Sequence, residues 1–266
     1  IHELPDFRGQ GMTYELYLPV YNGVKWLAVG TDASASFRFV EGSQERPIVV
    51  YGTSIAHGAS ASRPGLIWST RLKRRYECPV VNLGFSGSGK MEHVMFDALA
   101  EIDARAYIID CVPNCAALTC QEFEERLRYG IDRLRKAGKA PIIFAENQFI
   151  DHPSALVHSA GYRGQMEKDS VQQQVVKELQ AKGVEGLYYV TRADLGFEAD
   201  DFIEGDHLND IGMLKYERAY ARVLDQAMVG ADTMRHYTPC TQRRDGYDWI
   251  ERHNSIIRRN HETDPE

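Results

Sequence analysis

The chain has 266 residues, a formal net charge of −7 at pH 7, 43% hydrophobic residues and 26% charged residues. This length and composition fit one large globular α/β domain with a smaller additional piece. An acidic chain lacks the basic surface of nucleic-acid binders, and no apolar run approaches membrane-spanning length, so we expect no nucleic-acid partner and no membrane span; the sequence leaves the oligomeric state open.

The first part of the chain predicts a β-hairpin. Residues 12–29 alternate apolar and polar side chains on both sides of Asn22-Gly23. Asn-Gly between two alternating runs is typical of a tight hairpin turn. We assign residues 1–46 to an N-terminal β segment, residues 47–230 to the main domain and residues 231–266 to a C-terminal tail.

Five short apolar runs alternate with helical patterns through the main domain. This alternation predicts a parallel five-stranded sheet covered on both faces, a three-layer α/β/α sandwich with a flavodoxin-like arrangement. The expected strands are Ile48–Tyr51, Val80–Leu83, Ala106–Cys111, Pro141–Ala145 and Leu187–Val190. The expected helices are Leu66–Tyr76, Met91–Ala100, Gln121–Ala137, Gln165–Lys182 and Ile211–Met228.

Polar groups follow the ends of these expected strands. Ser54 comes after the first strand, the glycine-rich segment Gly84–Gly89 after the second, and Asn114 after the third. His207 precedes the last helix. Open α/β folds place their chemistry at the carboxyl ends of the strands. A serine hydroxyl needs a nearby base to act as a nucleophile, so this order predicts a hydrolase site.

Over about residues 47–228, these segments resemble the four blocks of the SGNH (GDSL-type) hydrolase superfamily. The resemblance implies the SGNH hydrolase fold and a serine esterase, with Ser54 as nucleophile and His207 as general base. It assigns the oxyanion hole to the backbone N–H groups of Ser54 and Gly87 and to the side-chain amide of Asn114. The third block departs from the family's Gly-x-Asn-Asp, because Cys111-Val112-Pro113-Asn114 keeps the amide without the glycine.

Two of these assignments are less specific than the others. Gly87 is preferred to Gly84 and Gly89 only by its spacing from the second strand. The family places the triad acid three residues before the histidine, which here is Glu204. Asp206 is the alternative acid, and a Ser–His dyad without a carboxylate is the third option.

The expected specificity segment is residues 147–163, since loops at this edge of the sheet carry selectivity. Its candidate pocket residues are Phe149 and His152. His57, three residues after the serine, is expected to line the pocket rather than to act as the base. The segment has no long apolar run, which favours short acyl esters, above all acetyl groups on carbohydrates.

Both ends of the chain carry further resemblances. The expected hairpin is similar to the last strands of a small β-sandwich that precedes some bacterial SGNH esterases. Residues 247–253 resemble the lead-in to an SGNH domain of the platelet-activating-factor acetylhydrolase type, so we expect a truncated second domain, with a simple C-terminal helix as an equal alternative. The sequence contains no signal peptide, as in a mature exported protein, and a periplasmic or secreted location is the working expectation.

Two other functions compete with the esterase. One is a catalytically inactive SGNH-fold carbohydrate-binding module; the other is a nucleotide-binding domain using Gly84–Gly89, which lacks the Walker lysine and the dinucleotide spacing. Five cysteines, an odd number, argue against a disulfide framework. We expect Cys111, Cys115 and Cys120 to be buried hydrophobes, with no metal and no cofactor.

Overall fold

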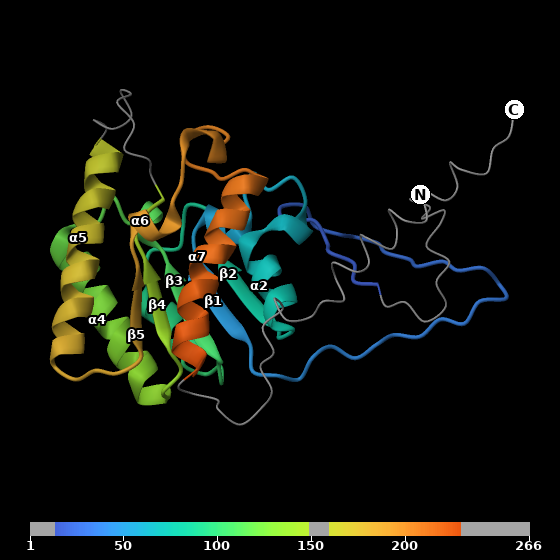
Figure 1. Cartoon of the computed structure of the whole chain (residues 1–266), viewed down its shortest axis with the longest axis horizontal. Coiled ribbons are helices and arrows are strands. Elements are labelled where there is room, and N and C mark those ends of the chain that lie inside the picture. The colour runs from blue at the N-terminus through green and yellow to red at the C-terminus, as the bar shows by residue number, and fades with distance from the viewer. Residues whose placement is uncertain (1–13, 149–159, 230–266) are drawn as a thin grey trace, which may run out of the picture. The chain divides into compact units, whose positions relative to one another are not determined.

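The computed structural model describes residues 14–148 and 160–229, and these contain a parallel sheet with helices on both faces (Figure 1). The strand order is β2-β1-β3-β4-β5, and every pairing is parallel. The predicted flavodoxin-like sandwich is therefore confirmed. The strands are β1 (Ile48–Gly52), β2 (Val80–Gly84), β3 (Ala106–Asp110), β4 (Ile142–Ala145) and β5 (Leu187–Val190).

The five expected helices are present in the expected order with shifted ends, and the structure adds two short helices, α1 and α6, that the sequence did not predict. The helices are α1 (Ser54–His57), α2 (Trp68–Tyr76), α3 (His93–Leu99), α4 (Cys120–Ala137), α5 (Ala160–Ala181), α6 (Arg192–Leu195) and α7 (Asp210–Val229). The largest difference is at α5, which begins at Ala160 instead of Gln165. The inward face of α5 includes the polar residues Gln165, Lys168, Asp169 and Gln172, so its apolar periodicity is weak and its start is hard to detect. None of the described helices is long and apolar enough to cross a membrane.

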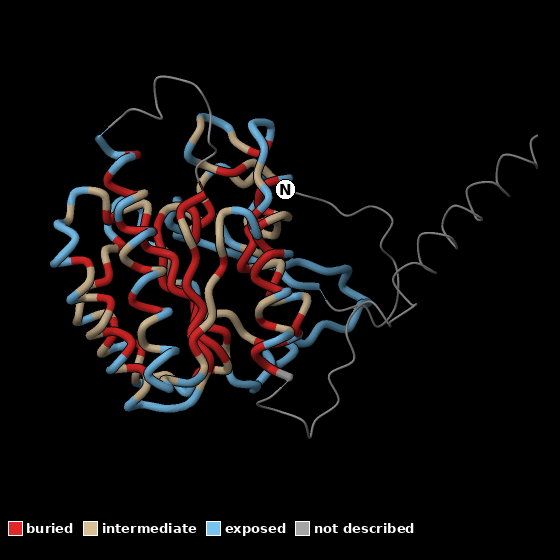
Figure 2. The backbone as a smooth tube through the Cα atoms, turned by 60° about the vertical axis from the view of Figure 1, so that its left-hand side comes forward, coloured by how far each residue is buried: buried red, intermediate tan, exposed pale blue. Residues whose placement is uncertain are grey.

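The core lies on both faces of the sheet, as the buried strands in Figure 2 show. All five residues of β1 are buried, and their side chains alternate between the two faces. Ile48 and Val50 join a cluster with α2 and α7, whereas Val49 and Tyr51 join a cluster with α3, α4 and α5. This strand therefore anchors both layers, and the segment after it starts from a rigid position.

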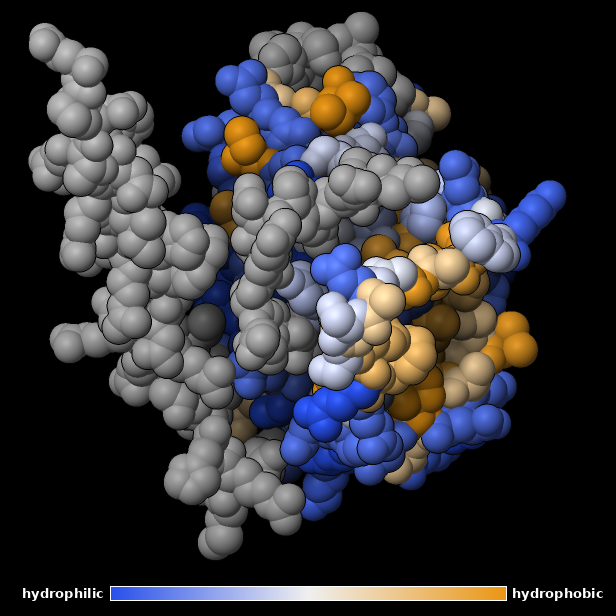
Figure 3. Space-filling model, turned by 90° about the vertical axis from the view of Figure 1, so that its right-hand side faces the viewer, coloured by the Kyte–Doolittle hydropathy of each residue, from blue (hydrophilic) through white to orange (hydrophobic). Residues whose placement is uncertain are grey.

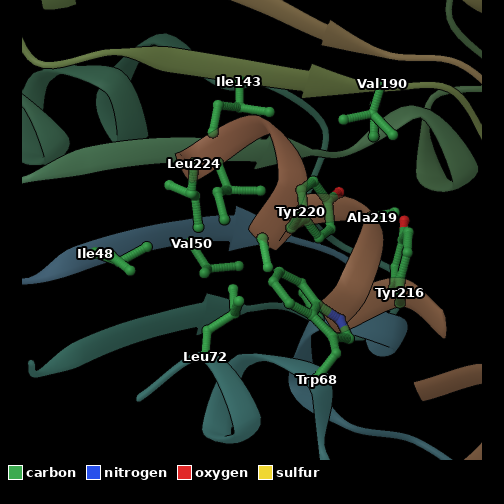
Figure 4. Packing of buried hydrophobic residues seen from close by; sticks show 14 of the residues in the cluster. Ile48, Val50, Trp68, Leu72, Ile143, Val190, Tyr216, Ala219, Tyr220 and Leu224 are labelled. Carbon is green, nitrogen blue, oxygen red and sulfur yellow. The ribbon is translucent and has the colours of Figure 1, made fainter. Parts of the chain in front are cut away.

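An aromatic cluster connects α7 to the middle of the sheet (Figure 4), and a buried carboxylate beneath it binds one of its tyrosines. Trp68 stacks on Tyr220 with 4.7 Å between ring centroids, and Tyr216 packs edge-on against Trp68. The Tyr216 hydroxyl donates a 2.6 Å hydrogen bond to Asp110 Oδ2. Asp110 is fully buried, and loss of solvation raises its carboxyl pKa to about 6, although Tyr216 and Tyr220 act to lower it.

The expected hairpin around Asn22-Gly23 is wrong, since residues 14–46 contain no strand. Nearly every residue of this segment is exposed, including apolar ones that are visible on the face shown in Figure 3. An isolated two-stranded hairpin is marginal in water without a third strand or a packed face, which explains the missing pairing. The expected tail and truncated domain, residues 231–266, lie outside the described residues.

The cysteine prediction is confirmed for two of the three residues. Cys111 and Cys115 are buried, and burial raises the pKa of both thiols, for Cys115 to about 12. They are thus unreactive apolar side chains at neutral pH. Cys120 is exposed, because it opens α4 on the solvent side, directly after the Thr119 cap.

Burial of Asp110 makes stability depend on pH in a predictable direction. Between the ordinary aspartate pKa of 3.8 and the folded-state pKa of about 6, the folded chain binds a proton that the unfolded chain has lost. Stability must therefore fall as pH rises through this window, by about 2–3 kcal/mol for a shift of this size. Asp110→Asn keeps an acceptor for Tyr216 and removes the titration.

We expect Asp110→Asn to gain stability relative to the native chain on going from pH 4 to pH 7.5. The measurement is urea unfolding of both proteins at the two values, because other titrating groups cancel in the difference. A difference between the two proteins that does not change with pH would show that Asp110 does not titrate in this range.

Candidate active site

The register of the sheet brings three loops to one edge. Gly52 at the end of β1 pairs with Gly84 at the end of β2 and with Asp110 at the end of β3. The three strands therefore stop at the same level, with β1 between the other two. The segments that follow them carry Ser54, the glycine-rich turn and Asn114, so the fold places these sequence-predicted groups at a common edge.

Ser54 stands at the first position of the short helix α1, directly after β1. The side chain of Thr53 caps this helix by accepting a hydrogen bond from the N–H of Ile55 at 3.3 Å. The glycine turn packs against the same backbone: Phe85 N–H donates to the Gly52 carbonyl at 2.9 Å, and a Cβ at Gly89 would lie 2.2 Å from that oxygen. Only glycine at position 89 allows this approach, which fixes the two loops together.

A closed turn of the chain holds His207 and Glu204. Phe202 and Leu208 form an isolated antiparallel bridge, and Ile203 N–H donates to the His207 carbonyl at 2.9 Å. Gly205 has φ +93°, a conformation that L side chains rarely adopt, so the tight turn requires glycine there. The buried side chain of Leu208 anchors this turn in the core.

The three residues of the expected triad lie in contact. Ser54 Oγ is 2.8 Å from His207 Nε2, and His207 Nδ1 is hydrogen-bonded to Glu204 Oε1. A carboxylate can only accept, so Nδ1 carries the proton and Nε2 is left as the acceptor for the serine hydroxyl. This arrangement can remove the Ser54 proton while the Glu204 charge stabilises the imidazolium. Ser54 is half-buried, which leaves its oxygen accessible.

The Asp206 carboxylate makes no hydrogen bond to the His207 imidazole in the described residues, unlike that of Glu204. The backbone carbonyl of Asp206 accepts a 3.0 Å hydrogen bond from Gln148 Nε2, which ties the histidine turn to the loop that follows β4. Desolvation raises the pKa of the Asp206 carboxyl, and Glu204 acts in the same direction against the opposing effect of His207. The geometry therefore favours Glu204 over Asp206 as the partner of the histidine.

A further contact, which the sequence reasoning missed, joins the serine loop to the histidine loop. Asp210 Oδ1 accepts from Ser62 N–H at 2.9 Å, and its Oδ2 accepts from Ser62 Oγ at 2.6 Å. Partial burial raises the pKa of Asp210, but these hydrogen bonds outweigh it and the pKa is lowered overall. Asp210 is visible in the motif that contains His207, whereas no sequence signal marks Ser62 as its partner.

Of Gly84, Gly87 and Gly89, in the loop that follows β2, Gly87 is the one whose N–H makes no hydrogen bond in the described residues. Gly84 N–H donates to Asn82 Oδ1 at 2.9 Å, and Gly89 N–H donates to the Phe85 carbonyl at 3.1 Å. The N–H of Gly87, which is exposed and has φ +72°, has no partner within the described part of the chain. The unpaired N–H therefore favours Gly87 as a donor to a ligand, independently of its spacing from the second strand.

Asn114 reaches the same loop from the other side of β1. Its Nδ2 donates to the Phe85 carbonyl at 3.2 Å, and Gln165 Nε2 holds the preceding carbonyl of Pro113 at 3.0 Å. An amide nitrogen carries two hydrogens, so one remains for a ligand when the other is bound to Phe85. Asn114 thus braces the glycine turn and also retains a donor.

His57 lies beside the N-terminal segment. Its Nε2 is 3.0 Å from the Val20 carbonyl, and its ring stacks on Tyr21 with 4.3 Å between centroids. Within the described residues it makes no hydrogen bond to Ser54 Oγ, which is bound to His207, and its pocket role stays a prediction. Phe149 and His152, the other two candidate pocket residues, lie outside the described residues. No group of three or more His, Cys, Asp or Glu side chains in residues 14–148 and 160–229 could hold a metal ion.

Comparison with solved structures gives neighbours of the same architecture. A Bacteroides ovatus protein described as a GDSL-like lipase is 31% identical, with a TM-score of 0.61 over 69% of this chain and 54% of that chain. A salicylyl-acyltransferase from a tetracycline biosynthetic pathway is 17% identical, with a TM-score of 0.58 over 73% and 58% of the two chains. A carbohydrate acetylesterase from Sinorhizobium meliloti is 12% identical, with a TM-score of 0.53 over 68% and 99%.

The two more distant neighbours, below 25% identity, share the fold alone. The match spans little more than half the length of the first two proteins. No curated protein matches the chain. The model of the GDSL-like lipase/acylhydrolase family matches residues 45–225, which include the contacts of the expected triad described above. With this match over more than half of its length, the chain belongs to the GDSL-like lipase/acylhydrolase family.

Proposed function

We propose that this chain is a serine esterase that hydrolyses short-chain acyl esters, with acetyl groups on carbohydrates as the preferred class. The observation that carries the proposal is the continuous contact from Ser54 Oγ through both nitrogens of His207 to Glu204. In this proposal Ser54 is the nucleophile, His207 the general base and Glu204 the triad acid. A nucleophile, a base and an orienting carboxylate in series are what acyl transfer requires.

The reaction follows from the positions of these atoms. Ser54 Oγ attacks the ester carbonyl as His207 Nε2 takes its proton, and the carbonyl oxygen becomes an anion. The N–H groups of Ser54 and Gly87 and the Asn114 amide donate to that anion. His207 then returns the proton to the departing alcohol. Water, activated by the same histidine, attacks the acyl group and releases it from Ser54.

The acyl preference rests on the surroundings of the site. Ser54 is half-buried, and Phe85 and Gly87 on the neighbouring turn are exposed, so the described site is open. A long acyl chain would gain little in such a site, because the hydrophobic contribution scales with the apolar area removed from water. A carbohydrate acetylesterase among the structural neighbours supports an acetylated sugar as substrate, at the level of fold.

The first prediction of the proposed function concerns the nucleophile and its base. Ser54→Ala and His207→Ala should each lower kcat by about 10³-fold or more, and the double variant should be little worse than either single one, because the two residues act as a unit. Initial rates on 4-nitrophenyl acetate measure this. A Ser54→Ala chain that retains most of its esterase activity would refute the proposal and leave a binding module as the alternative.

The second prediction ranks the two carboxylates. Glu204→Gln replaces the acceptor of the Nδ1 proton, and kcat should fall by about 10²-fold or more. Asp206→Asn serves as the matched control on the same turn, and its kcat should stay within about 2-fold, since its carboxylate does not hold the imidazole. The reverse order would assign the acid to Asp206, and two mild effects would indicate a dyad.

The third prediction concerns the oxyanion donor Asn114. Asn114→Ala removes a hydrogen bond that strengthens as the carbonyl oxygen becomes an anion, so kcat should fall by about 10²–10³-fold with KM nearly unchanged. Thermal unfolding must accompany the kinetics, because Asn114 also binds the Phe85 carbonyl. Loss of the folded state, or a rise in KM with unchanged kcat, would remove Asn114 from the oxyanion hole.

A further inference from the structure

In the described residues, the N-terminal segment contacts the serine helix through a pair of aromatic rings and a hydrogen bond. Tyr21 and His57 stack with 4.3 Å between centroids and 27° between planes. The neighbouring Val20 carbonyl lies 3.0 Å from His57 Nε2, and because a carbonyl only accepts, that nitrogen is the donor. One ring contact and one hydrogen bond therefore fix Tyr21 in place, even though the segment around it has no regular structure.

The position of His57 places this ring pair next to the nucleophile. His57 is the last residue of α1, and Ser54 is the first, so the two share a face of the helix at a spacing of three residues. The backbone of His57 also lies against the end of β2, since a Cβ at Gly84 would come within 2.2 Å of His57 N. Tyr21 therefore stacks on a residue that lies one helical turn from Ser54.

The Tyr21 ring is held by His57 and remains accessible to solvent. It is 55% exposed, while His57 covers one of its faces. Other exposed apolar side chains flank the site: Phe85 lies two residues before Gly87, and Ile203 directly precedes Glu204. The exposed residue Asp206 adds an acceptor on the histidine turn. Exposed apolar side chains therefore occur on the same loops that carry the triad and the glycine turn.

We propose that Tyr21 is a stacking platform for the sugar ring that carries the ester, which makes it a specificity-determining residue of the site. This inference rests on the proposed esterase function. A sugar ring can place its C–H face on the exposed part of the Tyr21 ring while its hydroxyl groups remain hydrated. An acyl chain on the same half-open ring would remain partly wetted and gain less.

The test compares two acetyl esters that differ only in the alcohol. Methyl 2-O-acetyl-β-xyloside carries its single acetyl group on a sugar ring, and ethyl acetate carries its acetyl group on no ring. Tyr21→Ala should lower kcat/KM for the sugar ester by about tenfold, mainly through a higher KM, and leave ethyl acetate within about 2-fold. Tyr21→Phe keeps the ring and should retain the native values on both substrates.

Trp26→Ala is the matched control, since Trp26 is an aromatic residue of the same segment and 81% exposed. It should change neither substrate. Equal losses of kcat/KM on both esters in Tyr21→Ala would show that Tyr21 acts through the serine helix, and no loss on either would remove it from the site. A loss that grows from ethyl acetate to ethyl hexanoate would place Tyr21 on the acyl side. Each of these three outcomes for Tyr21→Ala would overturn the proposal that Tyr21 is a stacking platform.

Binding to a chain that cannot turn over separates this inference from the proposed function. In a Ser54→Ala background, titration calorimetry with the monoacetyl xyloside should give binding that is about tenfold weaker when Tyr21→Ala is added. If the native chain hydrolyses neither ester and this difference persists, the esterase proposal fails and the platform stands. If the native chain hydrolyses both esters and the difference is absent, only the platform fails.

Discussion

The hydrogen bond between Ser54 Oγ and His207 Nε2 joins positions that are 153 residues apart in the chain, and the rest of the molecule makes that contact specific. β1 is buried at every residue, so the loop that starts from it has little freedom. On the other side, the bridge between Phe202 and Leu208 closes the histidine turn on the core. A displacement of about 1 Å at either end would weaken such a bond steeply.

Several contacts away from the reacting atoms serve this constraint. The Ser62–Asp210 pair joins the loop after α1 to the start of α7, just beyond His207. Deeper in the core, Asp110 binds Tyr216 and so fixes α7 against β3. A buried carboxylate is expensive to keep ionised, and its raised pKa is the physical sign of that cost. The Ser62–Asp210 pair thus holds the site near the surface, and the Asp110–Tyr216 hydrogen bond holds it in the core.

The sequence could predict the parts of the site that local patterns determine. Strand ends followed by polar or small residues located the segments that carry Ser54, Gly87 and Asn114, and the resemblance to the SGNH blocks supplied the roles expected of these residues and of Glu204. The Ser62–Asp210 and Tyr21–His57 contacts could not be found, because each joins segments whose separation only the folded chain decides. The hairpin at Asn22-Gly23 failed for a related reason: a local turn signal does not supply the surface on which two strands must pack.

The central claim, that Ser54 is a nucleophile activated by His207, can be tested directly by covalent labelling. The folded chain is incubated with a fluorophosphonate, digested, and its peptides are analysed by mass spectrometry. A single adduct should appear on the peptide that contains Ser54, and the rate of its formation should collapse in the His207→Ala chain. An adduct on another residue, or no adduct on a chain that remains folded, would contradict the claim.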